Sequence, residues 1–204
     1  MIPVATGLVL RSPEGTRYLF DPGALCLELL TTGGPGALAR HEVLHEPADF
    51  TAWLGRSRLR LDPARLQVTP EELAQARTLR DTLWGLVRSR IRGQDLAAEH
   101  VATLNDAAAE HPLAPLIDPT GAHGWQTPAG GGQATATIAR DAVELFTGPF
   151  AARIRECGAD DCFLVFVDTS RPGRRRWCAM ERCGNRQKAR ALRARRDSEE
   201  NPLP

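Results

Sequence analysis

The chain has 204 residues, of which 42% are hydrophobic and only 5% aromatic, and its formal net charge is +1. This length suits one large domain, or a medium domain followed by a small module. No segment is apolar over the length of a membrane helix, which argues against a membrane protein. The apolar start at residues 2–10 also lacks the charged leader and cleavage site of a signal peptide, so we expect a cytoplasmic protein.

The small net charge conceals an uneven distribution along the chain. Residues 1–150 contain 13 basic and 17 acidic residues, whereas residues 151–204 contain 13 basic and 8 acidic residues. Between Arg171 and Arg196 there are 11 basic residues and a single acidic one, Glu181. A split of this kind favours contact between the C-terminal part and a polyanion.

The first 32 residues are expected to form strands. Residues 17–20 predict one strand, residues 21–23 a turn, and the apolar run 24–30 a second strand. Cys26 lies in that run and is interpreted as a small buried hydrophobic residue. A short helix is then expected to begin at Glu46-Pro47.

The clearest helix signal is a capping box. Thr69 occupies the N-cap and Glu72 the third helical position, and apolar residues then recur near the 3.6-residue period up to Ile91. Another helix is expected from Asp95 to just before Pro112. We expect these two helices to form an antiparallel hairpin.

Residues 113–136 are rich in Gly, Pro and Thr and predict a hairpin or an irregular loop. Residues 138–146 predict a helix that closes the first domain, and Gly148-Pro149 marks its boundary.

Four of the five cysteines lie in the last quarter of the chain. They form two pairs with the spacing Cys157-x4-Cys162, fifteen residues, and Cys178-x4-Cys183. Such pairs describe a tetrahedral tetra-thiolate site, and Zn²⁺ is the ion that fits it. In a reducing compartment paired cysteines favour a metal over a disulfide. We therefore expect one structural Zn²⁺ ion with closed coordination.

The expected fold class is α+β with two domains. Residues 1–149 would form a helix-rich domain with a small antiparallel sheet. Residues 150–204 would form a zinc-ribbon or treble-clef-like module that ends in a basic helix. Within the module, Cys157 and Cys162 would bracket a hairpin knuckle, and Cys183 would lie in the first turn of the last helix.

The surroundings of the cysteines resemble a known bacterial family. A resemblance to the CGNR-type zinc finger is carried by Asp168-x-Ser170-Arg171 and by Arg175-Arg176-Trp177-Cys178-x-Met180-x2-Cys183-Gly184-Asn185-Arg186-x-Lys188. The ABATE domain, which usually precedes this finger and is described for stress-induced transcription regulators, is resembled by Leu25-Cys26-Leu27-Glu28, Asp49-Phe50-x2-Trp53-Leu54, Arg77-x-Leu79-Arg80 and Leu104-Asn105. The chain departs from the ABATE pattern at residues 28–32, where Glu-Leu-Leu-Thr-Thr replaces Asp-Phe-x-Asn-Thr. The resemblance implies DNA binding, and it implies that all four paired cysteines are zinc ligands.

The last helix, expected over residues 183–196, is basic on most of its faces. Arginine can grip phosphate or guanine with two hydrogen bonds, so this helix suits a nucleic acid, with duplex DNA as the expected partner. The candidate contacts are Arg174, Arg175, Arg176, Arg186, Lys188, Arg190 and Arg193. The alternatives are an RNA-binding protein, an adaptor that meets an acidic protein, or a solvated basic tail. The N-terminal domain would dimerise or sense an unknown small-molecule signal.

One motif points to a different class of function. His41-Glu42-Val43-Leu44-His45 matches the H-E-x-x-H pattern of metalloproteases, which requires a helix that places both histidines on one face. Pro47 follows closely and disfavours such a helix. No nucleotide-binding loop or nucleophile elbow is present. We therefore expect a protein without catalytic residues and not an enzyme.

Overall fold

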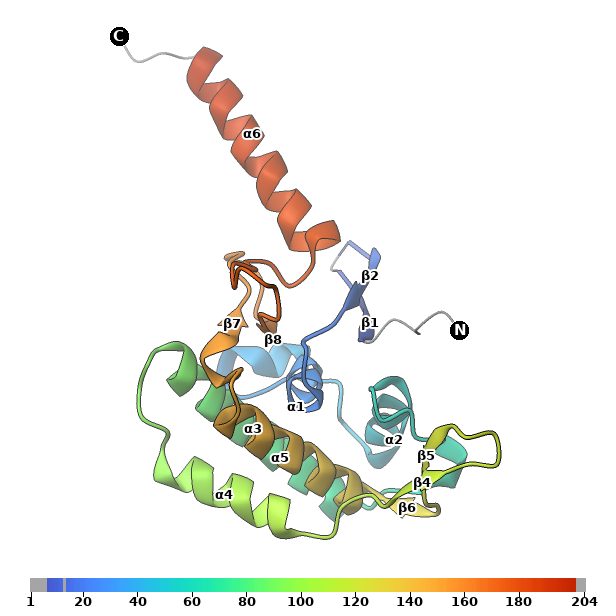
Figure 1. Cartoon of the computed structure of the whole chain (residues 1–204). Helices are drawn as coiled ribbons and strands as arrows, with labels where there is room; N and C mark the ends of the chain where they lie inside the picture. Colours follow the sequence, from blue (N-terminus) through green and yellow to red (C-terminus); the bar gives the residue numbers. More distant parts are fainter. Residues whose placement is uncertain (1–6, 13, 201–204) are drawn as a thin grey trace.

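The computed structural model of the chain describes residues 7–12 and 14–200. Figure 1 shows a helical body from which the last helix projects. The α-helices are α1 (Leu25–Leu29), α2 (Pro47–Arg56), α3 (Pro70–Ile91), α4 (Ala98–Ala109), α5 (Gly131–Thr147) and α6 (Asn185–Glu200). The strands are β1 (Leu8–Arg11), β2 (Arg17–Phe20), β3 (Leu66–Gln67), β4 (Pro115–Ile117), β5 (His123–Trp125), β6 (Ala129–Gly130), β7 (Ile154–Glu156) and β8 (Val165–Val167).

Helix α3 begins at the predicted capping box. The Thr69 hydroxyl accepts a hydrogen bond from the Glu72 N–H at 3.2 Å, and a Glu72 carboxylate oxygen accepts one from the Thr69 N–H at 2.9 Å. Helix α4 returns along α3 as expected, although it begins at Ala98 and not at Asp95 (Figure 1). Helix α5 packs against both, so these three helices form the framework of the body.

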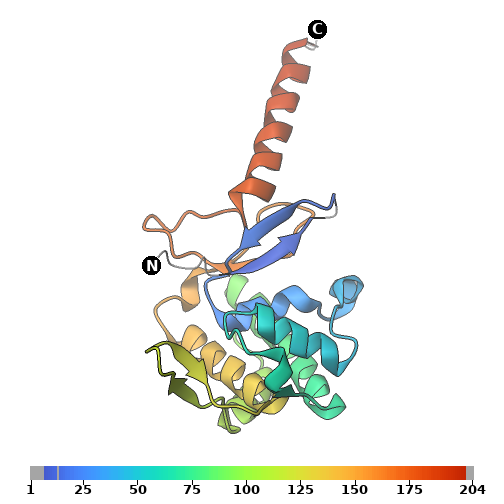
Figure 2. The same ribbon diagram turned by 90° about the vertical axis from the view of Figure 1, so that its right-hand side faces the viewer.

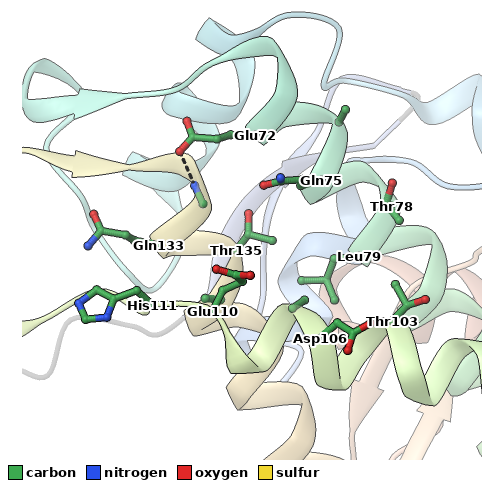
Figure 3. Close-up of a pocket in the computed structure, with 14 residues that line it drawn as sticks. Glu72, Gln75, Thr78, Leu79, Thr103, Asp106, Glu110, His111, Gln133 and Thr135 are labelled. Atoms are coloured by element: carbon green, nitrogen blue, oxygen red, sulfur yellow. Dashed lines mark hydrogen bonds between the residues drawn. The ribbon is translucent and has the colours of Figure 1, made fainter.

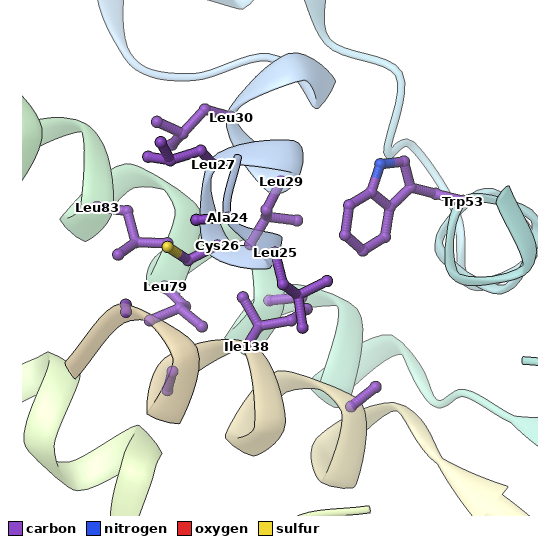
Figure 4. Close-up of a cluster of buried hydrophobic side chains, with 14 of the residues drawn as sticks. Ala24, Leu25, Cys26, Leu27, Leu29, Leu30, Trp53, Leu79, Leu83 and Ile138 are labelled. Atoms are coloured by element: carbon purple, nitrogen blue, oxygen red, sulfur yellow. The ribbon is translucent and has the colours of Figure 1, made fainter. Parts of the chain in front are cut away.

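The prediction of a strand over residues 24–30 is wrong, because this segment forms helix α1. Every residue of α1 is buried, and Cys26 points toward Leu83 while Leu25 lies near Ile138 (Figure 4). A short apolar run buried on all sides has no polar face, so its sequence does not distinguish a strand from a helix.

The described strands pair into four two-stranded sheets. The β1–β2, β4–β5 and β7–β8 pairs are antiparallel, and only the two-residue pair β3–β6 is parallel. The β4–β5 hairpin lies in the region predicted as a hairpin or a loop. The expected class is therefore confirmed: a helix-rich N-terminal region with small antiparallel sheets, followed by a cysteine-containing module that ends in a helix.

Strand β8 lies between two cores. Val165 and Val167 pack into the large core of the helical body, whereas Leu164 and Phe166 pack into a smaller core around the four clustered cysteines. This alternation follows from the two-residue period of a strand, which points successive side chains to opposite faces. The smaller core thus rests directly on the helical body.

The β1–β2 hairpin belongs to the smaller core. Tyr18 and Phe20 are buried against the cysteines, although they lie more than 130 positions earlier in the chain. The predicted first domain, residues 1–149, therefore includes a hairpin that packs with the C-terminal module. Among the helices that the structure describes, none has the length and apolar character needed to cross a membrane.

Candidate metal centre and basic helix

The four paired cysteines converge on one point. One sulfur atom from each of Cys157, Cys162, Cys178 and Cys183 lies within 4.8 Å of the others. The Sγ–Sγ distance is 3.8 Å between Cys162 and Cys178 and 3.5 Å between Cys178 and Cys183, and none of the four forms a disulfide. A tetrahedron with Zn–S bonds of about 2.3 Å has edges of about 3.8 Å. The donor set and its spacing therefore fit one structural Zn²⁺ ion.

Short turns place the first two ligands at the predicted knuckle between β7 and β8. The Cys157 N–H donates to the Leu164 carbonyl at 2.9 Å, which extends the β7–β8 ladder. The Cys162 N–H donates to the Ala159 carbonyl at 3.0 Å and closes the turn. Cys178 then joins this pair, because its N–H donates to the Cys157 sulfur at 3.4 Å.

The fourth ligand lies just before the last helix. Cys183 belongs to a π-helical turn, Met180–Gly184, and α6 begins at Asn185. Cys183 therefore lies two residues before α6 and not in its first turn, where it was expected. A Cβ atom on Gly184 would lie 2.7 Å from the Met180 sulfur. Glycine at this position leaves room for the end of the flexible Met180 side chain, which would have to shift if a Cβ were present.

The thiol groups need a cation at their centre to ionise together. Hydrogen bonds from Cys162 and Cys178 lower the pKa of Cys157, whereas their contact with Cys157 raises the pKa of both Cys162 and Cys178. A divalent ion supplies the charge that holds four thiolates in so small a space. Cys157, Cys178 and Cys183 are at most 5% exposed, which suits a closed structural site.

Two of the seven candidate nucleic-acid contacts, Arg175 and Arg186, make contacts within the module. The Arg175 guanidinium lies over the Phe166 ring, 4.1 Å from its centroid, and donates to the carbonyls of Asp21 and Trp177. Arg186 donates to Asp161 at 2.6 Å and approaches the Cys183 sulfur at 3.6 Å. Both cations lie beside the thiolates and offset their negative charge.

The other five candidates are exposed at the surface of the module. Arg174 and Arg176 lie in the loop before Cys178, and Lys188, Arg190 and Arg193 lie on α6. Arg190 also lies 3.7 Å from Asp161, a weak ion pair between two exposed side chains.

The loop before Cys178 is shaped by Asp168. The buried Asp168 carboxylate accepts hydrogen bonds from the Ser170 N–H and hydroxyl and from the Arg175 N–H, and the pKa of Asp168 is lowered despite its burial because of them. These bonds hold the turn that exposes Arg174.

Sequence reasoning missed the contribution of the N-terminal hairpin. The Tyr18 hydroxyl accepts a hydrogen bond from Arg182 at 2.8 Å, and the Arg182 guanidinium also lies 5.1 Å from the Tyr18 ring centroid. Burial raises the pKa of Tyr18 to about 12. The alternation of Tyr18 and Phe20 in β2 shows one buried face, but nothing in the sequence identifies the distant partner of that face.

The H-E-x-x-H segment does not form a helix. His41 ends a short 3-10 helix, Gly36–His41, and the following residues are extended up to the start of α2. The His41 ring stacks on Phe163 at 4.2 Å, while Glu42 accepts a hydrogen bond from the buried Arg80 at 2.8 Å. The two histidines therefore lack the shared helical face that a metalloprotease requires.

Helix α6 extends away from the body (Figures 1 and 2) and begins two residues after Cys183. Arg186, Arg190 and Arg193 recur at positions i, i+4 and i+7 on one face, and Lys188 and Arg195 lie on the opposite face. Lys188, Arg190, Arg193 and Arg195 are exposed. The helix thus offers cations on two sides from an anchored base.

Comparisons with known proteins agree with this architecture. Residues 23–149 match the ABATE family, described as "Putative stress-induced transcription regulator", and residues 153–196 match the CGNR zinc finger. No curated protein matches the chain. Because the ABATE match covers more than half of the sequence and the cysteine cluster lies within the second match, the chain belongs to the ABATE family and carries a C-terminal CGNR zinc finger.

Proposed function

We propose that this zinc-binding protein regulates transcription by binding duplex DNA through α6 and the loop at residues 171–176. The observation that carries the proposal is the projecting, cationic α6, fixed at its base by the four cysteines. In this proposal the chain is a binding protein and not an enzyme, and the zinc ion shapes the surface without entering a reaction.

The dimensions of α6 suit the DNA major groove. Its 16 residues span about 24 Å at 1.5 Å per residue, and the groove is about 12 Å wide, which admits one helix. Cations on both sides of a helix can meet the phosphates of the two groove walls, while arginine can also reach guanine edges. The module would contribute further phosphate contacts through Arg174 and Arg176.

The test compares charge removal on α6 with equal charge removal elsewhere. One variant carries Lys188→Gln, Arg190→Gln, Arg193→Gln and Arg195→Gln. The control carries Arg56→Gln, Arg60→Gln, Arg65→Gln and Arg92→Gln, four exposed arginines of the helical body. Arg175 and Arg186 stay unchanged in both, because their loss would disturb the cysteine centre.

Binding of the zinc-loaded proteins to a random-sequence duplex is measured by fluorescence anisotropy at several salt concentrations. Each lost phosphate contact should reduce the log–log salt slope by about 0.9, so the α6 variant should lose about 3 to 4 units of slope while the control keeps the parent's slope. Equal binding by both variants, or no binding by the parent at low salt, would refute the proposal. An unlabelled RNA competitor that displaces the duplex more effectively than DNA would assign the surface to RNA.

A further inference from the structure

The helical body contains a cavity of about 640 Å³ between α3, α4 and the start of α5 (Figure 3). This volume lies within the range of small-molecule sites, roughly 300–1,000 Å³. The first half of α3, the end of α4 and the start of α5, which line the cavity, lie on the side of the body away from α6 (Figure 1). It shares no residue with the metal centre or the proposed DNA surface.

Helical periodicity brings its walls together. On α4, Thr103, Asp106 and Ala107 follow the i, i+3, i+4 pattern and therefore share one face, and Glu110 follows directly after the helix. On α3, Glu72, Gln75 and Leu79 lie at positions i, i+3 and i+7 and also share one face.

The floor of the cavity is buried and mainly apolar. Leu79 and Ala136 are 1% exposed, and the hydroxyl of the buried Thr135 donates to the Gly131 carbonyl, which leaves its methyl group as part of the lining. Such a floor suits an apolar group of a ligand, because burying that group removes its surface from water.

The rim of the cavity is acidic. Its titratable residues are Glu72, Asp106, Glu110 and His111, and no lysine or arginine lines it. Within the described part of the chain, neither Asp106 nor Glu110 forms a salt bridge.

The nearby positive groups already have partners. The N-terminus of α5 opens onto the cavity, but the Glu72 carboxylate accepts a hydrogen bond from the Gly132 N–H at 2.9 Å and occupies the place that a bound anion would take. Arg140 lies outside the lining and donates to the backbone carbonyls of Ala108 and Glu110 at the end of α4. Among the described residues that line the cavity there is therefore no lysine or arginine to meet an anionic ligand, whereas two carboxylates there form no salt bridge.

We propose that this cavity binds an organic cation, an amine or quaternary ammonium that carries an apolar group. The apolar group lies over Leu79 and Ala136, and the cationic group lies at the rim between Asp106 and Glu110. This assigns the ABATE region a ligand site of its own, and the assignment does not depend on the proposed contact with DNA.

The experiment uses three probes that share one apolar body and differ in charge: 4-phenylbutylamine, 4-phenylbutan-1-ol and 4-phenylbutyrate. Each is titrated into the full-length zinc-loaded protein, and binding is followed through backbone amide chemical shifts by NMR. The pocket variant is Asp106→Asn with Glu110→Gln. Its matched control is Glu99→Gln with Glu144→Gln, two exposed carboxylates on α4 and α5 outside the cavity.

We expect saturable shifts at the amides around Leu79, Ala107 and Ala136 with the amine. The pocket variant should weaken amine binding about five- to tenfold, as expected for two partly solvated ion pairs, while the control binds like the parent. Ala107→Phe keeps the charges and fills the cavity, so it should also weaken binding. Equal affinity for the alcohol or the carboxylate, shifts confined to another region, absence of saturable shifts, or equal binding by pocket variant and control would each overturn the proposal.

Discussion

Replacing Glu42 by alanine should destabilise the helical body, because it leaves a buried cation without its main partner. Arg80 is 1% exposed, and its guanidinium lies 2.8 Å from a Glu42 oxygen and 3.0 Å from an Asp81 oxygen. Removal of one partner from a buried ion pair costs roughly 3–5 kcal/mol. Because Asp81 remains, we expect about 3 kcal/mol, at the lower end of that range.

Urea unfolding followed by tryptophan fluorescence measures this loss of unfolding free energy. The matched control is Glu99→Ala, an exposed carboxylate on α4, which should change stability by less than about 0.5 kcal/mol. If Glu42→Ala were as stable as this control, Glu42 would not hold Arg80 in the way that the structure indicates.

The same pair makes a prediction about pH. Burial alone would raise the pKa of Glu42, but hydrogen bonds from Arg80 and the Leu44 N–H bring it below its ordinary value of 4.5. A carboxyl group whose pKa is lowered by folding stabilises the folded state above its unfolded pKa, and this stability is lost as the pH falls through the folded pKa. The advantage of the parent over Glu42→Ala should therefore be full at neutral pH and shrink below 4.5. A constant difference down to acid pH would contradict this.

The remaining predictions concern the metal and one glycine. Removal of zinc by a chelator, or the substitution Cys183→Ser, should unfold the C-terminal module and leave the helical body folded. The reason is that the small core has few apolar residues, while structural zinc contributes on the order of 10 kcal/mol. Limited proteolysis should then cut near α6 but spare α3, and a module that stays intact without zinc would refute this. Gly34→Ala should lower the free energy of unfolding by about 2 kcal/mol, measured by thermal unfolding, since the φ of Gly34 is +154° and a Cβ would lie 2.5 Å from the Trp84 indole nitrogen. A Cβ at Gly36 would meet open space, so Gly36→Ala should lower it by less.

The sequence predicts elements well where the signal is local. The Thr69 and Glu72 capping box sets the start of α3 to the residue, and the cysteine spacing identifies all four members of the cluster. Both signals depend on contacts between residues that are close in sequence or on chemistry specific to one residue type.

Prediction failed where tertiary contacts decide the outcome. Helix α5 begins at Gly131, seven residues earlier than residue 138, because the Glu72 carboxylate and the Gln133 side chain satisfy N–H groups at its glycine-rich start. Glu72 comes from another helix, so no local pattern reveals this stabilisation. The intramolecular contacts of Arg175 and Arg186 were not predicted for a similar reason: in a run of arginines, composition does not tell which side chain packs inward.

The position of the β1–β2 hairpin has a consequence for the order in which the protein assembles. During synthesis, Tyr18 and Phe20 emerge early but find their core only after residue 183 has left the ribosome. The helical body can fold in that interval, since most of its contacts lie between residues 24 and 146. Closing so long a loop is slow, and the hairpin's apolar face stays uncovered until it closes. Metal uptake and hairpin docking should therefore form one late step, so that the last helix takes up its fixed orientation only in a fully synthesised, zinc-loaded chain.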